Sequence, residues 1–153
     1  MKRVLISTLV LALAVSLSQF GAGQTGANLD YQMIQAAYNN DVALAQQALA
    51  KGANIETRTK DNETPLIVAA ICGSTDALDF FLRRGANVEA KASDGSTALM
   101  SAAEFGDPDP VKLLLAKGAN VNVRDNDGHT ALYFATKEGN TEVVNLLKAR
   151  GAQ

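Results

Sequence analysis

One cysteine and one histidine, Cys72 and His129, are the most reactive side chains in this sequence. A Cys–His catalytic pair needs the histidine within hydrogen-bond reach of the thiol, and a catalytic metal needs three or four ligands close together. The two residues are expected on different kinds of element, Cys72 late on a helix and His129 in a loop. We therefore predict that the protein is not an enzyme and has no catalytic residues, no metal site and no cofactor.

The acidic run Asp125-Asn126-Asp127-Gly128 has some features of a calcium-binding loop. Such a loop carries a glycine at its sixth position and carboxylates at its first and twelfth positions. With Gly128 as the sixth residue, the first and twelfth positions fall on Val123 and Phe134, whose side chains cannot bind a cation in this way. We interpret the run as a tight turn, for which an Asp-Gly pair is well suited.

A second acidic pair, Asp107 and Asp109, could act as a general acid and base only if both carboxyl groups faced a cleft. Each is followed by a proline. Proline is favoured at the first position of a helix, and aspartate at the residue before it. We interpret the segment as the turn between two helices, with Asp109 as the N-cap and Pro110 as the first helical residue.

These residues belong to a repeat with a period of 33 residues. Threonine followed two residues later by leucine starts at positions 64, 97 and 130, and Gly-Ala starts at 52, 85, 118 and 151. Glycines at 73, 106 and 139 keep the same interval, and alanine pairs at 36–37, 69–70 and 102–103 extend it to an N-terminal unit. Several independent columns in one register indicate a repeat architecture.

Each unit is expected to form two helices and a loop. Thr64 is of the residue type that caps a helix, and Pro65 fits the first helical position. The glycine column then marks the end of this first helix. A second helix carries apolar residues at helical spacing, such as Leu78, Phe81 and Leu82. Polar, turn-prone residues lead to the next threonine.

The register resembles the ankyrin family over residues 29–153, whose T-P-L-H-x-A signature occurs here as TPLIVA, TALMSA and TALYFA. Ile67, Met100 and Tyr133 replace the histidine, so we expect apolar contacts where the family forms hydrogen bonds. The resemblance implies an all-α fold, an ankyrin-repeat solenoid of four helix-turn-helix units with hairpin-like loops. The units are expected at about residues 29–54, 55–87, 88–120 and 121–153.

The N-terminal residues form a segment of a different kind. Two basic residues precede an apolar run at 4–17, and small residues follow up to Gly23. This order is typical of a secretory signal peptide, and the run is shorter than the roughly 20 residues that span a bilayer. We predict a signal peptide at 1–23, its cleavage site open among several pairs of small residues, and a linker at 24–28. The mature protein is then periplasmic or secreted, with no membrane segment.

Charge limits the class of partner. The chain of 153 residues has a formal net charge of −2. Nucleic-acid binding depends on clustered lysine and arginine residues that displace counterions, and no such cluster occurs. We therefore predict that the partner is another protein, that nucleic acid is not bound, and that the protein is a monomer.

The resemblance also implies where a partner binds: across the loop tips and along the concave face of the first helices. Non-consensus residues on that surface are the candidates. In the loops they are Arg58, Lys60, Asp61, Glu63, Lys91, Ser93, Asp94, Ser96, Arg124, Asn126, Asp127 and His129. At the ends of the first helices they are Tyr38, Asn39, Ile71, Cys72, Glu104, Phe105, Lys137 and Glu138. Two interpretations of Ile71 and Phe105 stay open: they face the groove as apolar anchors, or they fold under the neighbouring loop.

Together these observations predict an exported, non-catalytic module for protein–protein interaction. The chain also looks similar to bacterial periplasmic ankyrin proteins, some of which are associated with oxidative-stress defence. That resemblance implies a supporting role for an exported or stress-defence enzyme. The alternative is a thiol-based redox or metal-handling protein centred on Cys72, because export takes this single cysteine into an oxidising compartment. The simpler interpretation of Cys72 is a small apolar residue that fills space.

Overall fold

The computed structural model describes residues 25–153, which contain eight helices and no strand. The predicted signal peptide at 1–23 lies outside the described residues. The helices form four consecutive pairs: α2 (Thr25–Asn39) with α3 (Val42–Ala50), α4 (Pro65–Cys72) with α5 (Thr75–Arg83), α6 (Ala98–Phe105) with α7 (Pro108–Ala116), and α8 (Ala131–Lys137) with α9 (Thr141–Ala149). The predicted all-helical repeat fold is confirmed.

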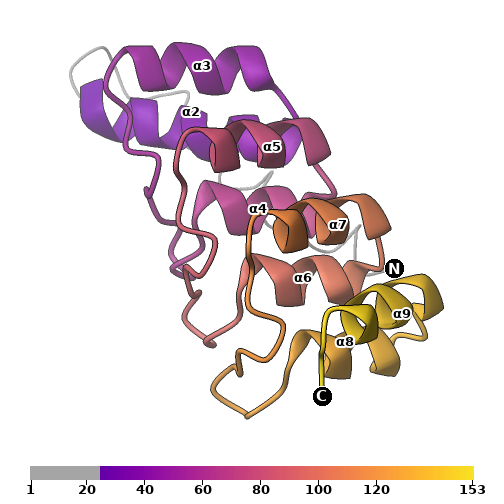
Figure 1. The fold of residues 1–153 in the computed structure, drawn as a ribbon. Helices are drawn as coiled ribbons and strands as arrows, with labels where there is room; N and C mark the ends of the chain where they lie inside the picture. Colours follow the sequence, from indigo (N-terminus) through magenta and orange to yellow (C-terminus); the bar gives the residue numbers. More distant parts are fainter. Residues whose placement is uncertain (1–24) are drawn as a thin grey trace.

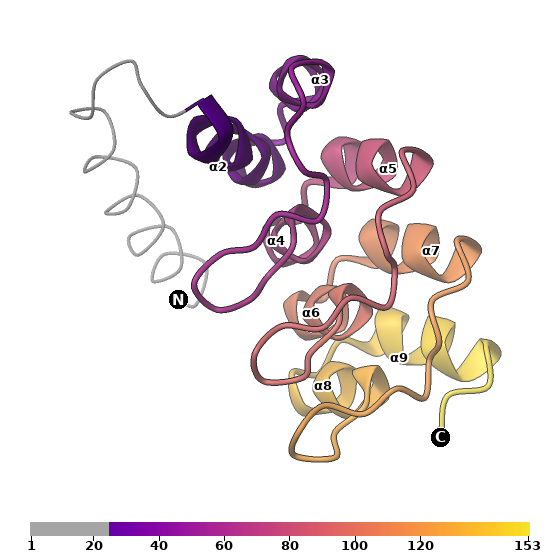
Figure 2. The same ribbon diagram turned by 90° about the vertical axis from the view of Figure 1, so that its left-hand side faces the viewer.

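The four helix pairs stack along one axis and make two layers (Figure 1). The first helices α2, α4, α6 and α8 contact one another in order and form one layer, and the second helices α3, α5, α7 and α9 form the other. Figure 2 shows the two layers end-on, with the loops beside α4, α6 and α8 projecting together on the side of the first helices. Among the described residues, no helix has the length and apolar character needed to cross a bilayer.

Threonine starts the first helix in each of the last three units, as predicted. The hydroxyl groups of Thr64, Thr97 and Thr130 accept hydrogen bonds from the backbone N–H three residues later, at 3.3, 3.4 and 3.4 Å. All three threonines have extended backbone and are buried, and Pro65 is the first helical residue of α4. Each cap therefore satisfies an amide that the helix itself leaves without an acceptor.

The first helices end where the glycine column predicts. Gly73 and Gly106 adopt the left-handed conformation, with φ of 68° and 77°. In the first unit Asn40 takes this place, with φ of 56°, since asparagine tolerates this region better than most residues. In the last unit Glu138 caps α8 in a right-handed conformation, and the positive φ falls on Gly139.

One predicted helix start is wrong. Helix α7 begins at Pro108 and not at Pro110, and Asp107, not Asp109, is its N-cap. The Asp107 carboxylate accepts a hydrogen bond from the Asp109 N–H at 3.1 Å. Both prolines then lie in the first turn, where the missing N–H removes no hydrogen bond from the helix.

Helix α2 differs from the other first helices because no hairpin precedes it among the described residues. It begins at Thr25, so residues 25–28 are helical and are not the linker that the sequence predicted. With 15 residues it is the longest described helix. Asp30 lies in the N-terminal turns of this helix. Its carboxylate accepts a hydrogen bond from the N–H of Asn54, in the segment that leads to the second unit, at 3.1 Å.

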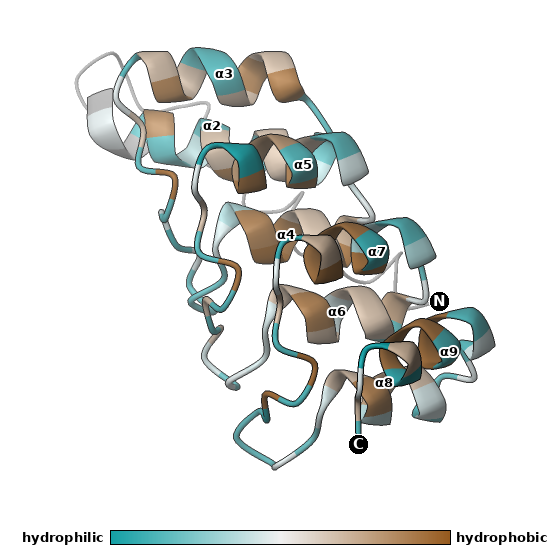
Figure 3. Cartoon of the chain, in the orientation of Figure 1, coloured by the Kyte–Doolittle hydropathy of each residue, from teal (hydrophilic) through white to brown (hydrophobic). Residues whose placement is uncertain are grey.

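The hydrophobic core lies between the two layers and between successive units. Alanine pairs at 36–37, 69–70 and 102–103 are at most 1% exposed, and their small side chains let the first helices approach closely. Ile67 and Met100 are buried in this core, as expected for apolar substitutes at the histidine position. Tyr133, in the last unit, is 42% exposed. Figure 3 shows hydrophobic colours where the helices face each other and hydrophilic colours along the loops.

Each loop between units is a hairpin with a backbone hydrogen bond across its base, which confirms the predicted loop shape. The N–H groups of Thr59, Ala92 and Asp125 donate to the carbonyls of Glu63, Ser96 and His129, respectively, at 3.0, 2.9 and 3.0 Å. The Asp125 carboxylate also accepts from the N–H groups of Asp127 and His129, at 3.0 and 2.8 Å. The acidic run at 125–128 is therefore a turn that satisfies its own backbone, as interpreted from the sequence.

Carboxylates also link one unit to the next. Glu56 accepts a hydrogen bond from the Asn87 N–H, and Glu89 accepts one from the Asn120 N–H, both at 2.7 Å. The donor and acceptor are 31 residues apart in each case. These charge-assisted bonds repeat with the period of the sequence and add polar contacts to the apolar stacking.

Candidate protein-binding surface

Three basic candidate residues, Arg58, Lys91 and Arg124, share one column of the repeat and order the hairpins. Arg58 donates to the backbone carbonyls of Asn62 and of Lys91, both at 2.8 Å. Lys91 donates to the carbonyl of Arg124 at 2.9 Å, and Arg124 donates to that of Gly128 at 2.6 Å. All three residues are exposed, yet their side chains form hydrogen bonds within and between the loops.

The hairpin tips are joined by backbone hydrogen bonds. Ser93 donates its N–H to the carbonyl of Asp61, and Asn126 donates its N–H to that of Asp94, both at 2.9 Å. The Asn126 side chain also donates to the Ser93 carbonyl at 3.0 Å. Lys60, Ser93 and Asn126, the candidates at the tips, are exposed. The tips therefore form an ordered edge and not three independent loops.

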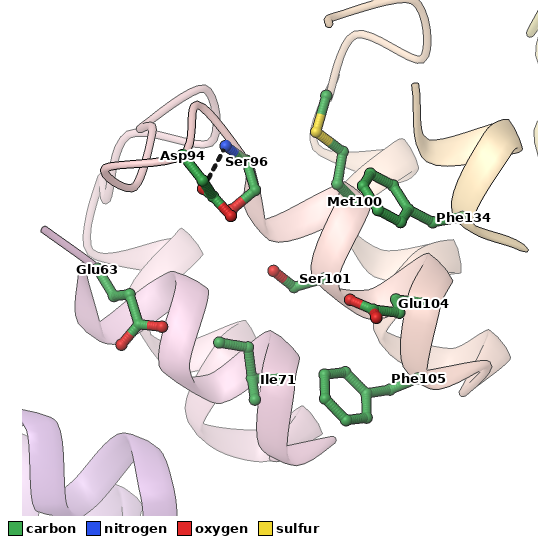
Figure 4. A pocket seen from close by; sticks show the side chains of 9 residues that line it. All are labelled: Glu63, Ile71, Asp94, Ser96, Met100, Ser101, Glu104, Phe105 and Phe134. Atoms are coloured by element: carbon green, nitrogen blue, oxygen red, sulfur yellow. Dashed lines mark hydrogen bonds between the residues drawn. The ribbon is translucent and has the colours of Figure 1, made fainter. Parts of the chain in front are cut away.

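A hollow of about 200 Å³ lies between this edge and the first helices (Figure 4). It is lined by residues of two hairpins, Glu63, Asp94 and Ser96, and of three helices, Ile71, Met100, Ser101, Glu104, Phe105 and Phe134. In Figure 4, Glu63 lies on one side of the hollow, and Ser101 and Glu104 extend toward it from α6 on the other. The hollow therefore spans the second, third and fourth units.

The structure brings six predicted candidates together in this hollow: Glu63, Ile71, Asp94, Ser96, Glu104 and Phe105. Ile71 and Phe105 are half-buried and line the hollow, so of the two interpretations left open, the structure favours that in which they face the groove. Sequence reasoning missed Met100, Ser101 and Phe134. Ser101 lies one helical turn before Glu104 and thus on the same face of α6, which is the signal that could have identified it.

Glu63 is the most unusual titratable group of the hollow. Its carboxylate accepts a hydrogen bond from the Thr59 hydroxyl at 3.1 Å. Burial raises the pKa of the Glu63 carboxyl above its ordinary value of 4.5, the bond from Thr59 opposes that rise, and the negative charges of Asp61 and Asp94 add to it. Among residues 25–153, no lysine, arginine or histidine lines the hollow. The site therefore holds a partly desolvated carboxylate in a negative environment.

Two further candidates of the last unit, His129 and Lys137, also lie outside the hollow. The His129 ring stacks on Tyr133, with ring centroids 3.9 Å apart and planes 10° apart, and its Nδ1 is 3.6 Å from a carboxylate oxygen of Asp125. Tyr133 in turn packs edge-on against Phe134, which does line the hollow. Lys137 is exposed at the end of α8. His129 thus supports the aromatic cluster at the end of the array.

Cys72 is half-buried at the end of α4 and packs against the hydrophobic core. This contact is what a small apolar residue at this position would make. Within residues 25–153, no group of three or more histidine, cysteine or acidic side chains is arranged to hold a metal ion. The thiol-based alternative gains no support from this packing and stays a prediction.

Comparison with known proteins follows the same register. The sequence matches a family model described as ankyrin repeats (3 copies) over residues 33–125 and again over 111–153. No curated protein matches closely enough to serve as a named relative. The helix pairs, threonine caps, glycine helix ends and projecting hairpins described above lie within the matched residues. By its sequence and its architecture together, the chain belongs to the ankyrin-repeat family.

Proposed function

We propose that this chain is an exported, non-catalytic module that binds a partner protein in the hollow between the hairpins and the first helices. The observation that carries the proposal is the hollow, where six non-consensus candidate residues meet although their helices and loops belong to successive units. Ankyrin repeats indicate protein–protein interaction as the class of function. The half-buried Phe105 supplies the aromatic surface that interface hot spots favour.

The binding surface is tested by substitution once a partner has been identified by cross-linking in cells and then purified. We expect Phe105→Ala to weaken the complex by about 2 kcal/mol, because truncating a hot-spot aromatic removes its contact area. That is roughly a 30-fold increase in Kd, measured by titration calorimetry. Gln46→Ala, on an exposed position of α3 in the other layer, is the matched control and leaves Kd unchanged. Equal affinity of the Phe105→Ala variant would refute this location.

Export is a separate part of the proposal and is supported by the basic, apolar and small-residue order of residues 1–23. We expect the full chain to appear in the exported fraction of a secretion-competent bacterium, with a new N-terminus between positions 19 and 28. A variant without residues 1–23 stays inside the cell. N-terminal sequencing of the exported protein measures both the export and the cleavage site, and an exported chain that still begins at Met1 contradicts the signal peptide.

We also propose that the chain supports an exported enzyme, which includes an enzyme of stress defence. This extension is motivated by the likeness to bacterial periplasmic ankyrin proteins. The partner recovered from the exported fraction tests it directly, by measuring whether adding the ankyrin-repeat chain changes the partner's activity or half-life. A partner without enzymatic activity would leave the binding function in place and remove this extension.

A further inference from the structure

One column of the repeat places a basic residue at the C-terminal end of every second helix. These residues, which are exposed and are the C-caps of α3, α5, α7 and α9, are Lys51, Arg84, Lys117 and Arg150. In Figure 1 all four helices end on the same, left-hand side of the molecule. The second helices also contact one another in order, so the four basic residues form a row along this side. We call them the C-cap row.

The charged groups of the C-cap row are available to a partner. Among residues 25–153, the side chains of Lys51, Lys117 and Arg150 have no hydrogen-bond or ion-pair partner. The Arg84 guanidinium lies over the Phe80 ring, 4.9 Å from its centroid, and this contact holds the cation at the surface. The basic column of the hairpins differs, because its side chains donate to backbone carbonyls of the loops. The helix dipole explains why a cation is stable at this end of a helix, and it leaves the charge free to bind an anion.

The acidic residues of the second layer lie mainly at the opposite ends of the same helices. At the N-caps and in the first turns they are Asp41, Asp76, Asp107, Asp109 and Glu142. Closer to the row, the carboxylates of Asp30, Glu56 and Glu89 each accept a hydrogen bond from the backbone N–H three residues after a C-cap. Within residues 25–153, these carboxylates form no ion pair with the row. The row therefore keeps its positive charge on a chain whose formal net charge is −2.

This arrangement limits the class of ligand. Each ion pair at an exposed position contributes little, so a ligand must engage several cations at once. Packed helices lie about 8–10 Å apart and an extended chain advances about 3.3–3.6 Å per residue, so carboxylates about three residues apart would meet successive C-caps. A long polyanion or an anionic membrane would also meet the negative charge of the rest of the chain, which a short segment avoids.

We infer that the C-cap row binds an extended, acidic segment of a protein, in which aspartate or glutamate recurs about every third residue. The segment runs across the C-terminal ends of the second helices, and its carboxylates pair with the four cations in turn. The lining of the hollow contains none of these cations. The row is therefore a second interaction surface, beyond the proposed function, and either surface can exist without the other.

The test is titration of the purified protein against a labelled peptide that has four glutamates separated by glycine and serine, measured by fluorescence anisotropy at low salt. A second peptide of the same composition carries its four glutamates in succession. One protein variant, Lys117→Gln with Arg150→Gln, removes two cations of the row. The matched control, Lys112→Gln with Lys137→Gln, removes two exposed cations outside the row and leaves the same net charge. Circular dichroism checks that all three proteins are folded.

We expect the spaced peptide to bind more tightly than the peptide with successive glutamates. Its Kd should rise about fivefold for the Lys117→Gln, Arg150→Gln variant, because two exposed ion pairs are lost, and stay the same for the control. Higher salt should weaken the complex, since the charges are exposed. The inference is overturned if the spaced peptide does not bind at low salt, if both peptides bind equally, or if its Kd is unchanged for the row variant.

Two other anions are titrated in parallel: vesicles that contain phosphatidylglycerol, and a short DNA duplex. We expect both to bind more weakly than the spaced peptide. Tighter binding of either one, lost in the row variant, would mean that the row binds a membrane or a nucleic acid, and it would overturn the acidic segment as the ligand. None of these outcomes bears on the binding of a partner in the hollow.

Discussion

At the scale of single residues, the candidate surface contains two kinds of polar side chain that the sequence cannot distinguish. Arg58 and Arg124 vary from the repeat consensus as binding residues do, yet they donate to backbone carbonyls of the hairpins. Every residue offers such a carbonyl, so no pattern of side chains reveals these acceptors in advance. Glu63, by contrast, lies in the hollow, where its charge is partly desolvated. The structure is needed to separate loop-ordering residues from binding residues.

Glu63 leads to a prediction about pH. The raised pKa means that the folded protein holds this proton up to a higher pH than the unfolded chain, whose carboxyl ionises near 4.5. Stability therefore falls as pH rises from 4.5 through the folded pKa, since the unfolded state binds fewer protons in that window. We expect Glu63→Gln to melt at the same temperature as the wild type at pH 4 and at a higher temperature at pH 7.

Thermal unfolding followed by circular dichroism measures this difference in the free protein. Asp127→Asn, an exposed position of the third hairpin, serves as the control and should show no comparable gain at pH 7. A Glu63→Gln gain of the same size at both pH values would mean that the amide packs better for reasons unrelated to charge.

At the scale of elements, local signals sufficed wherever a residue type has one strong structural preference. The sequence predicted three such features: the threonine caps, the left-handed residue that ends α4 and α6, and the turn of the third hairpin. Each of them depends on a few adjacent residues. The start of α7 was not, because two Asp-Pro pairs satisfy the same local rule. The repeat register distinguishes them, because Asp41, Ser74 and Asn140 precede the other second helices at the same column as Asp107.

The hairpins allow a prediction about the contact between neighbouring elements. Gly95 has φ of 82°, and a Cβ added there would lie 2.5 Å from the side-chain oxygen of Asn126 in the next hairpin. We expect Gly95→Ala to lower the free energy of unfolding by about 3 kcal/mol, from the left-handed conformation and from displacement of Asn126. Denaturation in urea measures this loss.

Gly128 provides the matched control, since it occupies the same column with φ of 83° and nothing lies within 4 Å of an added Cβ. Gly128→Ala should therefore cost only the conformational part, roughly 1–2 kcal/mol. Equal losses for the two variants would show that the contact between hairpin tips contributes no stability.

At the scale of the whole molecule, each unit contacts its neighbours along the stack, so stability spreads from unit to unit. The repeat and its complete set of helices were predictable because the period is visible in the sequence. The hollow was only partly predictable, because it forms between successive units and is lined also by Met100, which is buried in the core. Ile67, one repeat before Met100, does not line it.

Position in the array determines the outcome of identical substitutions. Leu114 and Leu147 occupy the same column and are both fully buried, but Leu147 belongs to the last unit, which has a described neighbour on one side. We expect Leu114→Ala to lower the free energy of unfolding of the whole array by about 3–4 kcal/mol. Leu147→Ala should instead release α8 and α9 first, which hydrogen exchange resolves as lost protection confined to these helices. Equal loss of protection in α4 would contradict nearest-neighbour stacking.

The polar links between units have a consequence for how such a chain can change length. Their donors and acceptors lie 31 or 33 residues apart, as in Glu56 with Asn87 and Arg58 with Lys91. If one complete period is duplicated or lost, every such link forms again with a new neighbour. If a gene rearrangement instead breaks a unit in the middle, a carboxylate and an amide no longer meet. Viable descendants of this chain should therefore grow or shrink in whole steps.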